Sequence, residues 1–266
     1  MDWHFSLAGL LVGFLVGLTG MGGGSLLAPI LLLIFQVPPI WAVGTDLAYS
    51  TVTKAVGSVV HIQQKFVNFK VALWLALGSV PATLISVFLV QYVHKHSGML
   101  INTIIIHTIG VVLLLVAATL LLKPLLTYLI ERRQQTSNSE TFLPSRWETH
   151  WQPLITVLIG AAVGFLVGLT SVGSGTLIII SLFLLYPKIT PKELVGTDVF
   201  QALLMLLAGS IGYLFGGGIN WTIVSLLLIG SLPGVLIGSR LSKYVPDAYL
   251  RPVLAIVLAL SGWKLI

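Results

Sequence analysis

The sequence contains no cysteine and very little charge. None of its 266 residues is Cys, and Asp, Glu, Lys and Arg together make up 8% of the chain. The absence of cysteine excludes disulfides, thiolate metal sites and cysteine nucleophiles. About a quarter of the residues of a typical soluble domain are charged. The shortage of charge therefore excludes an ordinary soluble protein.

Apolar residues, in contrast, make up 56% of the chain. They gather in ten segments, at 5–19, 25–36, 42–62, 67–93, 99–122, 153–170, 176–187, 194–215, 220–240 and 249–266. Long runs of this kind are typical of helices in a lipid bilayer. The sequence therefore predicts an all-α polytopic membrane protein. Its formal net charge of +6 is better explained by membrane orientation than by nucleic-acid binding.

The two halves of the chain repeat the same landmarks. Residues 13–19 recur without change at 164–170, and the tripeptide Gly-Thr-Asp at 44–46 recurs at 196–198. A polar stretch separates the two copies. An internal repeat of this kind is typical of transporters. We expect a first membrane repeat at 1–123, a cytoplasmic linker at 124–152 and a second membrane repeat at 153–266.

Each half contains one segment that is too short to cross the bilayer upright. Segments 25–36 and 176–187 each span about 18 Å, against a hydrocarbon core of about 30 Å. If each joins the preceding segment as a broken or re-entrant helical hairpin, each half has five segments and the second half is inverted. With both termini outside, the inside then holds Lys65, Lys70, Lys123, Arg132, Arg133, Arg146, Lys188, Lys192, Arg240, Lys243 and Arg251, and the outside holds Lys95 and Lys264.

The alternative joins each short segment to its neighbour as one broken span and makes the halves parallel. The basic residues would then divide 7 against 6, rather than 11 against 2 as in the inverted arrangement. Basic residues are concentrated on the cytoplasmic side of membrane proteins. The sequence therefore predicts two inverted-topology repeats, in a bacterial-type inner membrane.

Glycine-rich stretches precede both short segments. Residues 17–25 are Gly-Leu-Thr-Gly-Met-Gly-Gly-Gly-Ser, and residues 168–176 are Gly-Leu-Thr-Ser-Val-Gly-Ser-Gly-Thr. Paired helix breaks are the best sequence indication of a transporter's binding site, and free N–H groups that open a helix favour an anion. The alternative is that the glycines only allow close helix packing. The predicted substrate-binding residues here are Thr19, Gly20, Gly22, Gly23, Gly24, Ser25, Thr170, Ser171, Gly173, Ser174 and Thr176.

The third segment carries a single polar face. Asp46, Ser50, Lys54, Gly57 and His61 follow at steps of three or four residues, which places them in one stripe of a helix. Lys54 is the only basic residue deep inside a predicted span. A buried ammonium needs a partner, a water-filled cavity or an anionic ligand. We predict that Lys54 binds the anion; the structural alternative pairs it with Asp46 or a carbonyl.

Two threonine–aspartate pairs are the predicted coupling or gating residues. They are Thr45 and Asp46 in the first half and Thr197 and Asp198 in the second. Both pairs also suit the N-terminal cap and first turn of a helix. His61 is a further gating candidate, although its place near the membrane edge equally suits an interfacial residue.

The motifs together resemble a known family. The pattern Gly-Leu-Thr-Gly-Met-Gly-Gly-Gly-Ser-Leu-Leu-Ala-Pro at 17–29, with Gly-Thr-Asp at 44–46 and Gly-Ser-x-Pro at 78–81, resembles the sulfite exporter TauE/SafE family of membrane permeases. The second loop differs from the first at three positions, where Ser171, Val172 and Ser174 replace Gly20, Met21 and Gly23. The resemblance implies an inner-membrane carrier for sulfite, sulfonates or related sulfur oxyanions, and it leaves the particular anion open.

The expected function is therefore alternating-access transport of a small sulfur oxyanion, with proton coupling as an option. Two alternatives remain, an anion channel and a membrane subunit that scaffolds a sulfur-metabolising enzyme. The sequence has no His-Glu-x-x-His, Gly-x-Ser-x-Gly or phosphate-loop motif, so we expect neither enzymatic activity nor a cofactor. The expected partners are the anionic substrate and the lipid bilayer, and no nucleic acid.

Overall fold

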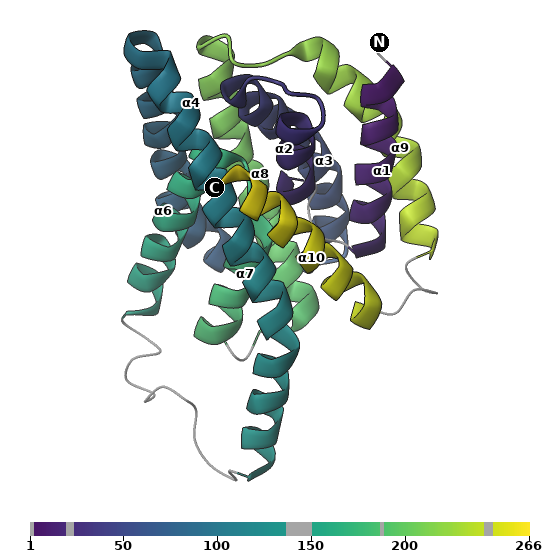
Figure 1. The fold of residues 1–266 in the computed structure, drawn as a ribbon. Coiled ribbons are helices and arrows are strands. Elements are labelled where there is room, and N and C mark those ends of the chain that lie inside the picture. The colour runs from purple at the N-terminus through teal and green to yellow at the C-terminus, as the bar shows by residue number, and fades with distance from the viewer. Residues whose placement is uncertain (1–2, 20–23, 137–150, 187–188, 242–246) are drawn as a thin grey trace.

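The computed structural model of the chain is a bundle of helices (Figure 1). It describes residues 3–19, 24–136, 151–186, 189–241 and 247–266. The first half holds α1 (Trp3–Thr19), α2 (Gly24–Leu33), α3 (Pro39–Gln63) and α4 (Phe69–Thr136). The second half holds α6 (Gln152–Thr170), α7 (Ser174–Leu185), α8 (Pro191–Phe215), α9 (Trp221–Leu241) and α10 (Asp247–Leu265). Each of the ten predicted segments falls in a helix, because α4 contains two of them.

Helix α4 is bent and longer than the sequence predicted. Its backbone leaves the helical region at Ser97, where φ is −153° and ψ is 66°, and this divides the fourth predicted segment from the fifth. Beyond the fifth segment α4 continues to Thr136. Residues 124–136 are therefore helical, although the sequence assigned them to the linker. Leu, Glu, Arg and Gln, which favour helices, are frequent in this stretch and explain the extension.

Several helices are long and apolar enough to cross a membrane. In the described part of the chain these are Phe69–Ser97, Ile101–Leu121, Gln152–Thr170, Lys192–Phe215 and Trp221–Leu241. Shorter apolar helices lie at Trp3–Leu18, Gly175–Leu185 and Pro252–Leu265. Helix α3 has sufficient length but is less apolar, since it carries the polar face predicted from the sequence. The protein is therefore a multi-pass membrane protein.

Glycines bring helices of the two halves into backbone contact. Helix α1 packs along α9, and α4 packs along α6. A Cβ atom added to Gly13 of α1 would lie 2.7 Å from the Cα of Ser231, and one added to Gly164 of α6 would lie 2.6 Å from the Cα of Ser79. Gly13 and Gly164 are equivalent in the repeat, and so are Ser79 and Ser231. The same contact is therefore made twice, with the two halves exchanged.

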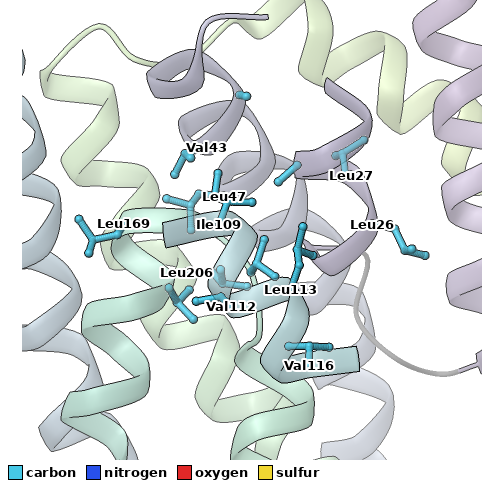
Figure 2. Packing of buried hydrophobic residues seen from close by; sticks show 14 of the residues in the cluster. Leu26, Leu27, Val43, Leu47, Ile109, Val112, Leu113, Val116, Leu169 and Leu206 are labelled. Atoms are coloured by element: carbon cyan, nitrogen blue, oxygen red, sulfur yellow. The ribbon is translucent and has the colours of Figure 1, made fainter. Parts of the chain in front are cut away.

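Helices α3 and α8, one from each half, pack against each other. Leu47 of α3 and Leu206 of α8 are fully buried and belong to one apolar cluster with Leu113 of α4 and Leu169 of α6 (Figure 2). Burial of such side chains removes the facing surfaces of α3 and α8 from lipid. The polar face of α3 is consequently enclosed by protein.

Candidate functional site

Helix α3 carries buried polar side chains on one face. Asp46 is fully buried, Ser50 is buried, and Lys54 is 7% exposed. The Ser50 hydroxyl donates to Asp46 Oδ1 at 3.2 Å. Asp46 Oδ2 has no hydrogen-bond partner among the described residues. The polar face therefore points into the protein and retains a free carboxylate oxygen.

Lys54 forms an ion pair with Asp198 of α8. The Nζ of Lys54 lies 3.6 Å from Oδ2 of Asp198, which is 1% exposed. The alternative in which Asp46 is the partner of Lys54 is wrong, since the carboxylate comes from the other half of the chain. Removing one member of a buried ion pair costs about 3–5 kcal/mol, because the other charge is left without compensation. The pair therefore ties the two halves together at their central helices.

The chain breaks between α6 and α7, as the glycine-rich stretch predicted. Helix α6 ends at Thr170 and α7 begins at Ser174. In the break, Ser171 and Gly173 have φ of 60° and 95°, in the left-handed region that glycine adopts without strain. The N–H of Ser171 donates to Val167 O at 2.7 Å and closes the last turn of α6. Helices α6 and α7 therefore meet at a compact turn.

The two ends of this break meet different carboxylates. The Ser171 hydroxyl, at the end of α6, lies close to the Asp46 carboxylate. At the beginning of α7, a Cβ added to Gly175 would lie 3.4 Å from Asp198 Oδ2. Ser171 is 2% exposed, and neither its hydroxyl nor that of Thr176 has a hydrogen-bond partner in the described part of the chain. The break thus lies beside both buried aspartates.

The other predicted binding residues of the two glycine-rich stretches that the structure describes lie at the ends of helices or in the turn between α6 and α7. The Thr170 hydroxyl donates to Leu166 O at 2.7 Å and accepts from the Val172 N–H at 3.2 Å, so it stabilises the turn itself. Gly173 lies in that turn, and Ser174 is the first residue of α7. In the first half, Thr19 ends α1, Gly24 begins α2, and Ser25 follows. The predicted residues Gly20, Gly22 and Gly23 lie outside the described residues.

Thr45 and Thr197 hold connections of the opposite half. Both lie inside their helices, α3 and α8, so the interpretation as helix caps is wrong. The Asn220 N–H donates to Thr45 Oγ1 at 3.1 Å, and the Asn68 N–H donates to Thr197 Oγ1 at 2.9 Å. Thr45 and Thr197 are equivalent in the repeat, and so are Asn68 and Asn220, so each threonine accepts a hydrogen bond from the asparagine of the opposite half. Each threonine therefore anchors the connection that enters α9 or α4.

Replacing Thr45 or Thr197 with valine is expected to lower the free energy of unfolding by about 1 kcal/mol, because a backbone N–H loses its acceptor. Thermal unfolding of the purified protein in detergent measures the effect. Thr53→Val is the matched control, since the Thr53 hydroxyl donates to Ser50 O within α3 and its loss leaves no donor unpaired. An equal decrease in all three variants would contradict the assigned role.

Gln201 and Tyr213 are two further buried polar residues that no sequence motif indicated. The Gln201 Nε2 donates to the Ser79 hydroxyl of α4 at 2.6 Å, and Gln201 is fully buried. It lies three residues after Asp198 on α8 and so extends the polar surface of that helix. The Tyr213 hydroxyl donates to Gly168 O at 3.2 Å, close to the helix break. The available signal was a lone amide within the apolar run of α8.

His61 lies apart from this cluster. It is half-buried in the last turn of α3, and its Nδ1 has no hydrogen-bond partner among the described residues. Lys54 lies about two helical turns closer to the centre of α3. His61 is therefore not brought together with the two aspartates.

Comparisons with known proteins agree over nearly the whole chain. A family profile described as sulfite exporter TauE/SafE matches residues 5–265. The chain is 39% identical to the probable membrane transporter protein YjnA of Bacillus subtilis, over 100% of both chains. It is 27% identical to the probable membrane transporter protein YunE of the same organism, over 97% of this chain and 94% of YunE. It is also 27% identical to the probable membrane transporter protein MJ0441 of Methanocaldococcus jannaschii, over 96% and 92% of the two chains. No solved structure matches the chain.

Proposed function

This chain belongs to the sulfite exporter TauE/SafE family of membrane transporters, and from that premise we propose that it carries a small sulfur oxyanion, such as sulfite or an organosulfonate. The observation that supports this proposal is the buried side chain of Lys54. Its ammonium group is 7% exposed and lies in the middle of a helix of a multi-pass membrane protein. Charged groups at such depth mark ion and substrate pathways by default. An oxyanion is the class of substrate that a buried ammonium attracts.

The anion site lies between Lys54 and the beginning of α7. The first N–H groups of a helix have no acceptor within the helix and carry the positive end of its dipole, so they bind oxyanions. Asp198 now occupies the space between α7 and Lys54. The hydroxyl of Thr176, which has no hydrogen-bond partner among the described residues, is a further donor for the anion. In the first half, Gly24 and Ser25 at the beginning of α2 are proposed to supply N–H groups in the same way.

Asp198 acts as the gate of this site. When the anion replaces Asp198 at Lys54, the Asp198 carboxylate loses the only counter-charge that it has among the described residues. A buried carboxylate without compensation is costly, so it takes up a proton. The anion and the proton then bind together and leave together. Transport is therefore coupled to proton movement in the same direction, and the sum of the two gradients determines whether the anion is exported or taken up.

The two halves form inverted repeats that alternate between opposite sides of the membrane. The exchanged contacts of Gly13 with Ser231 and of Gly164 with Ser79 support a two-fold relation between them. In Figure 1, α1 runs downward from the N-terminus and α6 runs upward, which supports opposite orientations. With 11 basic residues against 2, the positive-inside rule favours an inner-membrane orientation with residues 124–152 in the cytoplasm and both termini outside.

Purified protein in liposomes tests this function. Uptake of sulfite, sulfate, a small sulfonate and thiosulfate is measured with and without a pH gradient. We expect saturable uptake of one sulfur oxyanion, accelerated when the side that holds the anion is the more acidic. Uptake of none of these anions would overturn the proposed substrate class. Flux that does not saturate would indicate a channel instead of a carrier.

A further inference from the structure

Asp46 is a buried carboxylate without a counter-charge. Its side chain is fully buried in α3. Lys54, the one basic residue deep within a membrane helix, pairs with Asp198 and lies about 12 Å of helical rise from Asp46. The other basic residues that the structure describes lie in connections or near the ends of the helical spans. Because an ionised carboxylate alone in such surroundings is costly, Asp46 requires a cation.

Two hydroxyl groups lie close to the Asp46 carboxylate. Ser50 donates to its Oδ1, and the Ser171 hydroxyl lies close to the carboxylate from the end of α6. Asp46 Oδ2 and the Ser171 hydroxyl have no hydrogen-bond partner in the described part of the chain, although both residues are at least 98% buried. Two hydroxyls and a carboxylate are hard ligands, which suit alkali cations and protons.

The titratable groups around Asp46 provide no positive charge. Tyr49 of α3 lies close to Asp46, and Tyr213 of α8 packs against Gly44. Helix α2 contains no titratable residue, and α9 contains only Arg240 in its last turn. In α4, His107 is exposed and bonded to its own helix, and the other titratable residues lie towards the ends of the two spans. No described side chain therefore neutralises Asp46.

The end of α6 adds a negative potential at the same place. The last carbonyls of a helix have no partner within it and carry the negative end of the helix dipole. Helix α6 ends at Thr170, one residue before Ser171, which lies close to Asp46. In transporters with broken helices, the C-terminal ends of the half-helices hold cations and the N-terminal ends hold anions. The break therefore has a cation-attracting end at Asp46 and an anion-attracting end near Lys54 and Asp198.

We propose that Asp46, Ser50, Ser171 and the end of α6 bind a monovalent cation, either a sodium ion or a proton, at a site separate from the anion site. A divalent ion is not expected, because the site has one carboxylate and no group of three or more His, Asp or Glu among the described residues could hold a metal ion. The cation fixes the position of the α6–α7 break, whose other end receives the anion. The coupling rests on the proposed carrier function, whereas the cation binding does not.

Thermal unfolding of the purified full-length protein in detergent tests the site. In the sodium arm, sodium chloride replaces choline chloride at constant ionic strength and pH 8. In the proton arm, the pH is lowered from 8 to 5 in choline buffer. Saturating cation is expected to raise the unfolding temperature of the wild type by about 5 °C in one arm, because it binds only the folded state. The arm that responds identifies the cation.

Asp46→Asn is expected to lose this response, because a neutral amide needs no cation. Glu193→Gln, which makes the same change outside the site, is expected to retain it. A wild type that responds in neither arm, or an Asp46→Asn variant that responds fully, would overturn the proposal. If Asp46→Asn does not fold, Ser171→Ala is expected to raise the half-saturating sodium concentration about tenfold or to shift the pH midpoint; unchanged midpoints would also overturn it. No sulfur oxyanion is present, so this test and the transport test can fail independently.

Discussion

Lys54→Met is expected to lower the initial rate of sulfur oxyanion uptake by liposomes at least about 100-fold, because the anion loses its charge-assisted hydrogen bonds. Methionine retains most of the volume and flexibility of the lysine stem, so the change chiefly removes the ammonium. The variant also leaves Asp198 buried without its partner, which is 3.6 Å away in the wild type. The free energy of unfolding is therefore expected to fall by about 3–5 kcal/mol.

A double variant separates the loss of transport from the loss of stability. Lys54→Met combined with Asp198→Asn removes both charges and is expected to recover most of the lost stability without recovering uptake. Lys70→Met is the matched control, because Lys70 is exposed at the beginning of α4. This variant is expected to transport the anion at the wild-type rate. A folded double variant with wild-type uptake would exclude Lys54 from the anion site.

Labelling of single cysteines is expected to show opposite orientations of the two halves. The chain has no native cysteine, so each variant carries one reactive thiol. Phe215 is 82% exposed at the end of α8, and Lys192 is exposed at its beginning. In inverted repeats, a membrane-impermeant maleimide added to intact cells is expected to label Phe215→Cys fully and Lys192→Cys not at all. The positive-inside rule supplies the side that each position faces.

Two positions in the first half provide the reference. His94→Cys is expected to be labelled and Gln64→Cys protected, and both side chains are exposed in the structure. Permeabilised cells, in which all four variants are expected to react, control for reactivity. If Phe215→Cys is instead protected like Gln64→Cys while Lys192→Cys reacts like His94→Cys, the halves are parallel and the proposed inversion is wrong.

The positions of the helices were predictable because each depends on a local run of residues. Every predicted apolar segment lies in a helix, and the break between Thr170 and Ser174 falls in the glycine-rich stretch. Lys54 could also be identified in advance, since an isolated charge within an apolar segment is visible in the sequence. The helical conformation of residues 124–136, at the beginning of the predicted linker, was not predicted, although several of their side chains favour a helix.

The partners of the site residues were not predictable, because they come from helices far apart in the sequence. Lys54 pairs with Asp198, and Thr45 and Thr197 each accept a hydrogen bond from the opposite half. Gln201 contacts Ser79 across the interface of α8 with α4. Sequence spacing indicates which residues share one face of a helix. It does not indicate which other helix packs against that face, or with which of its residues.

The sequence by itself determined the membrane class, the internal sequence repeat, the helix break after Thr170 and the polar face of α3, because composition and local sequence pattern are sufficient for each. Only the tertiary structure decided which aspartate neutralises Lys54. Helices α3 and α8 pack with opposite directions, so Leu47 lies beside Gly209 and Gly57 lies beside Val199. This crossing brings Asp198 to Lys54 and leaves Asp46 beside the end of α6, where no described side chain compensates its charge.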